Sequence, residues 1–448
     1  MNPYLCTDFT NRALFSLLYQ SLFTVDRSYT PEPQLVKSFR ISEDMRTYTM
    51  TLENATFADG TALTTADVLA SLEAAKASRY YGGRFTHISA VSGEGSNLVF
   101  SLATPMENLP VLLDIPIVKA AEVNLDAPMG SGPYRLDTTS HPAILRRNTN
   151  WWCKAELAVN SPAIALQVAT TVTGVRDAFE FEGLGLVCAD PGSDQYADYR
   201  CDYELWDCEN GIFLYLACNM ESEVFSNPAV RSALVKAIDR DSLAGAYYRG
   251  FAYASALPAS PLSPYYSAPL AAKYSYDGGT ALTEAVSDAR KSGHEIVLLV
   301  NKDDSLRVRV AKDIQNMLSV AGLKVTLSEK NASEYEKALK GKTYDLYLGQ
   351  TKLSPNMDLT AFFSNKGSLN YGGISDVALN ALCKEALANY GNYYTLHKSV
   401  LDDGRLCPIL FRSYAVYATR GLLTGLTPSR DNIFYYSLGK TMETAQES

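Results

Sequence analysis

The chain has 448 residues, more than one ordinary domain holds, so we expect two or three packed units. Its residues are 47% hydrophobic and 20% charged, which is typical of a globular protein with few long disordered segments. The formal net charge of −9, without a run of lysine and arginine, argues against nucleic acid or an anionic membrane surface as a partner.

The longest apolar stretch, residues 109–118, is interrupted by Asp114 and Pro116 and is far shorter than the roughly 20 residues that a membrane span needs. We therefore predict no transmembrane helix. Residues 1–10 lack the basic head and the apolar segment of a secretory leader. That absence fits a mature fragment as well as a cytoplasmic protein.

The first hundred residues are predicted to mix helices with antiparallel strands. Residues 13–23 place apolar side chains at helical spacing, which predicts a short buried helix. Residues 47–52 and 98–102 alternate between apolar and polar side chains, as half-buried strands do. Thr64 and Asp67 form a start resembling a capping box for a helix that runs to about residue 77.

The middle of the chain is predicted to contain one strong helix and one connector. Residues 227–243 place their apolar side chains on one stripe, which predicts a single amphipathic helix. Residues 258–269 include four prolines, so we expect an extended connector and a candidate domain boundary there.

After the connector the pattern changes to strands and helices in alternation. Strands are predicted at residues 295–300, 324–327 and 343–349; the first helix between them ends at Gly322 and the second covers residues 333–339. This order predicts a parallel sheet with right-handed crossovers. Because ligands bind beyond the carboxyl ends of such strands, we expect residues 350–358 to lie at a cleft.

No motif of a metal-dependent or nucleophilic enzyme is present, although dispersed catalytic carboxylates would escape such a search. The four histidines are isolated, and no phosphate-binding loop or nucleophile elbow occurs. Four of the eight cysteines fall between Cys188 and Cys218, but none forms the C-x-x-C pair of a zinc site. We expect buried free thiols or one or two disulfides, and no cofactor, metal or catalytic residue.

Tyrosine is abundant, with 29 residues, and several lie in predicted loops: Tyr80, Tyr81, Tyr265, Tyr266 and Tyr371. A tyrosine offers a flat apolar ring and a hydroxyl that forms hydrogen bonds, which suits a site for varied ligands. Packing in the core and at its rim is the alternative for each of them.

Four segments, taken together and in order, resemble the bacterial extracellular solute-binding proteins of family 5, which include peptide-binding and nickel-binding proteins of ABC importers. They are LLYQSLFTVD at 17–26, the stretch 31–68 with its D-G-T turn, GSGPYRL at 130–136 and NPAVRSALVKAIDRDSL at 227–243. These signatures shape turns and helix ends, so we do not expect Asp59, Gly60, Gly132 or Asp239 to contact ligand.

The resemblance implies an α/β fold of the periplasmic-binding-protein-like class II, with two lobes and an extra subdomain inserted in lobe one. Lobe one would comprise residues 1–24, 131–257 and 421–448, the inserted subdomain residues 25–130, and the ligand-binding lobe two residues 258–420. The family normally has a strand before the equivalent of Asn2, so we expect that strand and a leader to lie outside this numbering. Cys6 is not expected to carry a lipid, because the residues before it form no leader.

Ligand contacts in the peptide-binding relatives come from four places. They correspond here to Tyr80 and Tyr81, to Tyr215 and Asn219, to Thr351, Lys352, Ser354, Asn356 and Asp358, and to Arg412 and Tyr414. Ser354 stands where peptide carriers have the aspartate that binds the free amino group, and Thr351 stands where they have a tryptophan. Because a buried ammonium needs a paired charge, recognition of a free amine would require Asp358 or Glu329 instead.

The resemblance implies a substrate-binding protein of an ABC importer, and no enzyme. It would capture a peptide or a similar small solute between two lobes by hinge closure and deliver it to a permease and ATPase complex. We expect a monomer that is extracellular or periplasmic, tethered to the outer face of the cytoplasmic membrane by a lipid anchor outside this chain. A sensor or chaperone on the same fold is the alternative, and an enzyme comes third. Nickel or haem are further cargoes in the family, but four scattered histidines disfavour free nickel.

Overall fold

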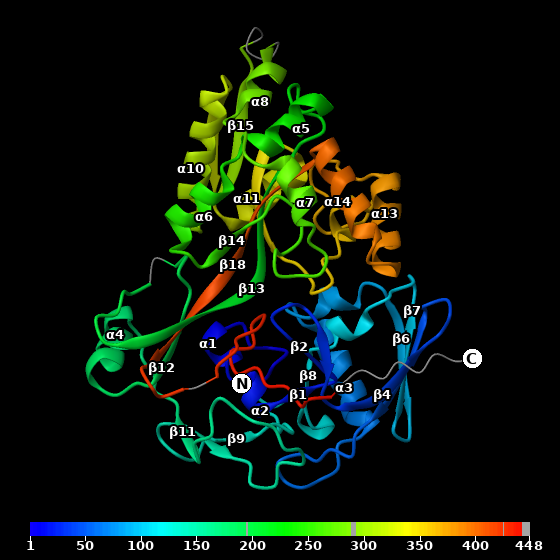
Figure 1. Cartoon of the computed structure of the whole chain (residues 1–448), viewed down its shortest axis with the longest axis vertical. Coiled ribbons are helices and arrows are strands. Elements are labelled where there is room, and N and C mark those ends of the chain that lie inside the picture. Colours follow the sequence, from blue (N-terminus) through cyan, green and yellow to red (C-terminus); the bar gives the residue numbers. More distant parts are fainter. Residues whose placement is uncertain (194–195, 288–292, 424, 441–448) are drawn as a thin grey trace. The chain divides into compact units, whose positions relative to one another are not determined.

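The computed structural model describes residues 1–193, 196–287, 293–423 and 425–440 (Figure 1). The chain forms two compact units of mixed α and β structure. The first unit comprises residues 1–189, 197–208 and 414–448, and the second comprises residues 190–196 and 209–413. Two of the four passages of the chain from one unit to the other lie within long strands, β13 (Tyr203–Cys218) and β18 (Leu406–Thr419). Pro258, where we expected the crossing, lies inside the second unit, and the predicted division into five segments stays a prediction.

The first unit begins with two single-turn helices instead of one longer helix. These are α1 (Phe9–Arg12) and α2 (Phe15–Leu18). The short buried helix predicted within residues 13–23 is therefore present as α2, but it is a single turn and the predicted length is wrong. The Leu18 carbonyl accepts a hydrogen bond from the Gly132 amide at 3.0 Å, and the chain continues as β1 (Gln20–Ser21), which pairs with β8 (Pro116–Ile117). These tertiary hydrogen bonds outweigh the local preference for helix.

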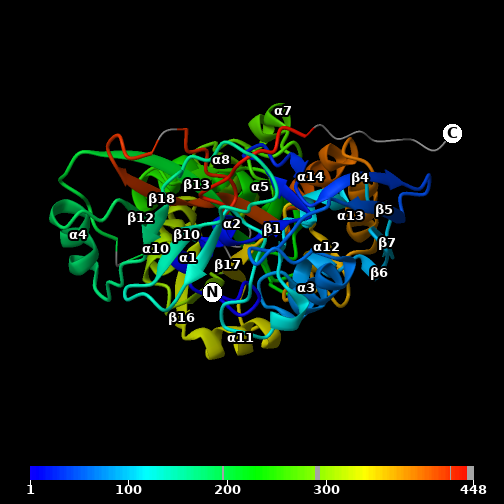
Figure 2. The ribbon, with the colours of Figure 1, turned by 90° about the horizontal axis from the view of Figure 1, so that it is seen from below.

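An antiparallel sheet of four strands forms beside α3 (Thr65–Ala77) in the first unit (Figure 2). Its order is β4 (Val36–Ile41), β5 (Thr47–Leu52), β7 (Asn97–Leu102) and β6 (Ile88–Glu94). Both strands predicted here are confirmed. The capping box is confirmed too, because Asp67 accepts a hydrogen bond from the Thr64 amide at 2.8 Å.

Short strands and turns complete the first unit. Strands β2 (Phe23–Val25) and β3 (Pro31–Pro33) pair with each other, and β9 (Tyr134–Asp137), β10 (Ile144–Arg147) and β11 (Ala163–Ala165) form a second sheet. Single turns of 3-10 helix are η1 (Gly82–Phe85), η2 (Leu109–Leu112) and η3 (Ala120–Glu122). Helix α4 (Val172–Phe181) precedes β12 (Leu186–Ala189), which pairs with the end of β18.

The second unit contains the predicted parallel strands. They are β15 (Glu295–Asn301), β16 (Lys324–Lys330) and β17 (Leu346–Lys352), and β15 pairs in parallel with both others. Strand β13 pairs antiparallel with β17, and β14 (Ala252–Ala254) pairs with β18. The predicted parallel sheet is confirmed, and its carboxyl edge leads into the loop after Lys352.

Helices flank these strands in the second unit (Figure 1). They are α5 (Pro228–Ala237), α6 (Arg240–Tyr248), α7 (Ala268–Ala271), η4 (Ala272–Tyr274), α8 (Thr280–Ala285), α10 (Ser305–Val320), α11 (Ala332–Gly341), α12 (Thr360–Phe363), α13 (Val377–Ala388) and α14 (Asn392–Asp403). The prediction of one helix over residues 227–243 is wrong, because the backbone is extended at Ile238 and the Asp239 carboxylate caps α6 by accepting from the Ser242 amide.

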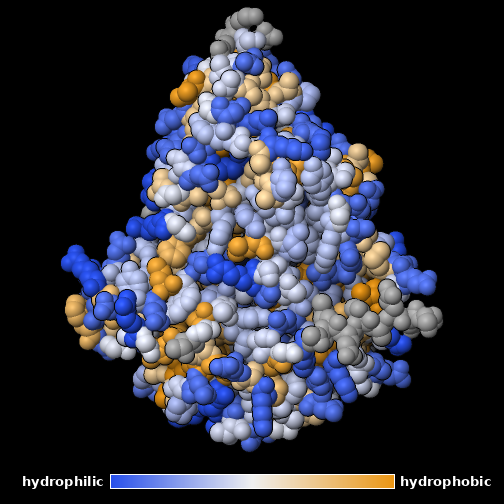
Figure 3. Space-filling model, viewed as in Figure 1, coloured by the Kyte–Doolittle hydropathy of each residue, from blue (hydrophilic) through white to orange (hydrophobic). Residues whose placement is uncertain are grey.

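The core of the second unit lies between the sheet and its helices. Fully buried apolar residues from the strands, such as Leu298 and Leu346, pack with Ile314 of α10 and Leu234 of α5. Polar residues cover much of the face seen in Figure 3, and hydrophobic residues are grouped in small areas. In the described part of the chain, every helix is too short or too polar to span a bilayer.

Candidate functional site

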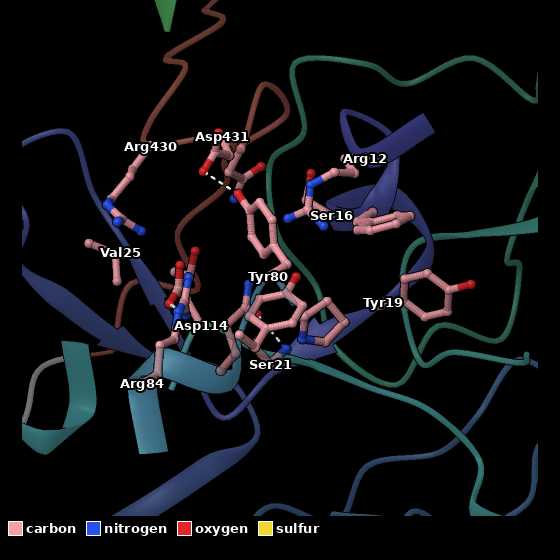
Figure 4. A pocket seen from close by; sticks show the side chains of 16 residues that line it. Arg12, Ser16, Tyr19, Ser21, Val25, Tyr80, Arg84, Asp114, Arg430 and Asp431 are labelled. Carbon is pink, nitrogen blue, oxygen red and sulfur yellow. Dashed lines mark hydrogen bonds and ion pairs between the residues drawn. The ribbon is translucent and has the colours of Figure 1, made fainter. Parts of the chain in front are cut away.

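A small polar cavity lies in the first unit, among segments that are far apart in the sequence (Figure 4). Its volume is about 70 Å³. One water needs ~10–15 Å³ of such space, so the cavity can hold a few waters or one small polar group. Side chains from α1, α2, η1 and the strands β1, β2 and β8 line it, together with Tyr80, Tyr81 and residues 430–432.

Tyr80 and Tyr81, two predicted ligand contacts, both line this cavity. Their rings meet edge to face, with centroids 4.9 Å apart. The Tyr80 hydroxyl donates a hydrogen bond to the Asp431 carboxylate at 2.6 Å, which Figure 4 shows as a dashed line. Burial, and then the negative charge of Asp431, raise the pKa of Tyr80 well above its ordinary value, so the hydroxyl keeps its proton.

Three arginines that the sequence did not single out complete the cavity: Arg12, Arg84 and Arg430. The side chain of Arg84 is 7% exposed and forms an ion pair with Asp114. The Arg12 guanidinium lies over the Tyr80 ring, 3.0 Å from its centroid. Burial lowers the pKa of the Arg12 guanidinium. The neighbouring tyrosines and Asp431 together raise it by more than burial lowers it, so the net shift is upward and the group is charged.

In the second unit, Tyr215 and Asn219 are buried. The Tyr215 ring packs edge-on against Tyr347 and Phe362, with centroids 5.8 and 5.1 Å away. The Asn219 amide donates to the Lys342 and Tyr344 carbonyls at 3.2 and 2.8 Å. These contacts fix the chain that leads into β17, and a ligand role for either residue stays a prediction.

Residues 350–352 of the predicted loop belong to β17, and the loop that follows is held by its own side chains and by a contact of Lys352 with β13. The Ser354 hydroxyl donates to the Asn356 side chain at 2.7 Å, and Lys352 donates to the Asn210 carbonyl at 2.5 Å. The Asp358 carboxylate accepts from the backbone amide and the hydroxyl of Thr360, each at 2.8 Å. Asp358 thus has a local structural role, and its pairing with a ligand amine stays a prediction.

The remaining predicted residues of this set fall in different places. Thr351 is half-buried in β17, and Glu329, the alternative partner for an amine, is exposed in β16 with Lys312 at 4.0 Å. Arg412 belongs to the second unit, where it forms an ion pair with Asp190. Tyr414 belongs to the first unit, and its ring stacks on Phe9 with centroids 3.5 Å apart.

The structure therefore brings Tyr80 and Tyr81 together with five charged residues that sequence reasoning missed: Arg12, Arg84, Asp114, Arg430 and Asp431. The one local signal was Arg84, which follows the tyrosine pair in the segment YYGGR. The other four lie in three distant segments, and only the fold makes them neighbours.

Four of the eight cysteines are buried. All eight are free thiols, which resolves the alternative between thiols and disulfides. Burial raises the pKa of Cys188 to about 12, and raises that of Cys218 and Cys383 as well, so these thiols stay protonated. Among the described residues, no group of histidine, cysteine, aspartate and glutamate side chains could hold a metal ion.

Comparison with known proteins identifies the family. The model of the bacterial extracellular solute-binding proteins, family 5 Middle, matches residues 30–372. The chain belongs to this family. Family 5 proteins are the solute-binding components of ABC importers, and the chain is such a component, as the resemblance implied.

Individual known proteins resemble the chain in sequence or in fold. The glutathione-binding protein GsiB of Escherichia coli O1:K1 / APEC is 23% identical over 399 residues, which are 83% of this chain and 74% of GsiB. The ABC transporter substrate-binding protein CtaP of Listeria monocytogenes has a TM-score of 0.77 at 18% identity, covering 98% of this chain and 96% of CtaP. DppA of Helicobacter pylori, solved with the peptide STSA, has a TM-score of 0.69 at 19% identity and coverages of 98% and 96%. The predicted two-lobed α/β fold is thereby confirmed.

Proposed function

We propose that this family 5 protein captures a peptide, or a solute of similar size such as glutathione, and passes it unchanged to an ABC permease. Membership of the family over residues 30–372 is the observation that carries this proposal. The names of two relatives support the ligand class, since GsiB is a glutathione-binding protein and DppA was solved with a peptide.

Hinge closure is the proposed mode of capture. The two units are joined by few segments, among them β13 and β18, each of which contains a passage of the chain from one unit to the other. Rotation about a few residues of such strands is enough for one unit to move as a body. A ligand stabilises the closed state only by contacts that the open state lacks. X-ray scattering with and without bound ligand tests this, and an unchanged radius of gyration at saturation would contradict it.

Thermal unfolding with a panel of peptides and glutathione tests the ligand class. A ligand at a hundred times its dissociation constant stabilises the folded state by about 2.7 kcal/mol, which gives a clear rise in the melting temperature. Mass spectrometry of the protein as purified identifies any ligand that remains bound. If no member of the panel raises the melting temperature and no such ligand is found, the proposed class is wrong.

We further propose that the protein has no catalytic activity towards its ligand. The relatives GsiB and CtaP are binding proteins. Incubation of the purified protein with a bound peptide, followed by mass spectrometry, is expected to return the peptide intact. Hydrolysis that persists after repeated purification would refute this part of the proposal.

The proposal also covers the cellular location and the oligomeric state of the protein. Family 5 solute-binding proteins are extracellular or periplasmic. We propose that this one acts as a monomer at the outer face of the cytoplasmic membrane, tethered by a lipid anchor outside this chain. Fractionation of cells that express the full gene, and light scattering of the purified protein, test the tether and the monomer separately.

A further inference from the structure

The cavity of the first unit has more positive than negative charge in its lining. Three arginines, Arg12, Arg84 and Arg430, face two aspartates, Asp114 and Asp431 (Figure 4). Arg84 and Arg430 are only 7% and 5% exposed, so water screens little of this charge. An excess of one charge in such a place favours an anion as its partner.

Both aspartates already have partners within the cavity. Asp114 forms an ion pair with Arg84, which also donates to the Leu112 carbonyl at 3.2 Å. Asp431 accepts the hydroxyl hydrogen of Tyr80 at 2.6 Å. Neither contact involves Arg12, which forms a side-chain hydrogen bond with Tyr81. Its Nη1 is buried and forms a hydrogen bond with no atom of the described residues. One donor of Arg12 is therefore available to an acceptor from outside the chain.

The orientation of Arg12 suits that role. Its guanidinium carbon lies over the Tyr80 ring, whose hydroxyl is held by Asp431, and it is 5.6 and 5.5 Å from the centroids of the Tyr81 and Phe15 rings. A guanidinium that contacts aromatic rings can still donate hydrogen bonds from its N–H groups. A carboxylate matches these groups in geometry and in charge.

We propose that this cavity is a carboxylate subsite, in which Arg12 donates hydrogen bonds to a carboxylate of the captured ligand. The inference rests on the proposed capture of a small solute, and it specifies that the solute carries a carboxylate which the first unit recognises. The cavity of about 70 Å³ is large enough for one such group and too small for a whole peptide. From the sequence, recognition of a free amine would require Asp358 or Glu329, whereas the cavity of the first unit points to recognition of a negative charge.

Two matched pairs of probes test the subsite in the full chain. Succinate and succinamide have the same shape and differ in charge, and so they report on the cavity alone. Glutathione and its diethyl ester report on the captured ligand. The variants are Arg12→Gln and, as a control with the same change of charge, Arg135→Gln, which replaces an exposed arginine of β9 in the same unit.

Arg12→Gln is expected to weaken binding of succinate on the order of tenfold or more, the effect of losing a charged hydrogen bond, and to leave succinamide unchanged. Arg135→Gln is expected to change neither. The ratio of acid to amide affinity is the decisive quantity, because a general loss of structure lowers both affinities together. Equal affinity of the wild type for succinate and succinamide, or no binding of either, would overturn the inference.

The glutathione arm separates this inference from the proposed function. If glutathione binds the wild type and Arg12→Gln equally well, the subsite is refuted and ligand capture stands. If succinate binds in an Arg12-dependent manner while glutathione and every peptide fail to bind, the subsite stands and the proposed ligand class is refuted.

Discussion

Replacement of Arg412 by methionine is expected to destabilise the second unit, because this arginine holds the segment at Asp190. Its Nη2 donates to both carboxylate oxygens of Asp190 at 2.7 and 2.8 Å, and its Nη1 donates to the Gln350 side chain at 3.1 Å. The Arg412 side chain is 8% exposed and that of Asp190 is 34% exposed. Removal of one partner from a fully buried pair costs about 3–5 kcal/mol. Because water can rehydrate the partly exposed Asp190 carboxylate, we expect about 2–3 kcal/mol here.

A double-mutant cycle with Arg412→Met and Asp190→Ala measures the coupling between the two side chains. Urea unfolding, followed by circular dichroism, is expected to give a coupling energy of about 1–2 kcal/mol. Lys398→Met is the control, since it removes an ion pair with Asp402 whose members are 51% and 50% exposed, and such pairs contribute below about 1 kcal/mol. Additive effects of the two single variants would refute the reasoning and would leave Arg412 available for a ligand.

Two further substitutions test the packing and the pH response of the second unit. A Cβ atom at position 349 would lie 2.4 Å from the Tyr215 ring, so Gly349→Ala should destabilise by about 1–3 kcal/mol in urea unfolding, whereas Gly245→Ala, a helical position with open space, should not destabilise. His397 is fully buried, and burial lowers its pKa to about 3, so the unfolded state binds a proton more readily. The free energy of unfolding therefore decreases as the pH falls from 6.5 towards 3. At pH 5 it is lower by about 2 kcal/mol than above pH 6.5. His397→Leu should remove that part of the loss between pH 7 and 5, and an unchanged loss would contradict the prediction.

The sequence by itself determined the elements whose pattern is local. The alternation at residues 47–52, the capping box at Thr64 and the strands around Val297 each depend on neighbours within a few residues, and each was predicted correctly. Family 5 could also be recognised, because its signature segments encode turns and helix ends that the fold requires at fixed positions.

Only the tertiary structure decided where hydrogen bonds to distant residues override the local preference for helix. Leu18 ends its helix because Gly132 donates to its carbonyl, and no pattern within residues 13–23 indicates that contact. The same limit applies to the candidate site. Arg12 and Asp431 are separated by most of the chain, and their shared cavity exists because folding places their segments beside Tyr80. The net charge of a cavity depends on which side chains the fold brings together, and the spacing of residues along the sequence does not show this.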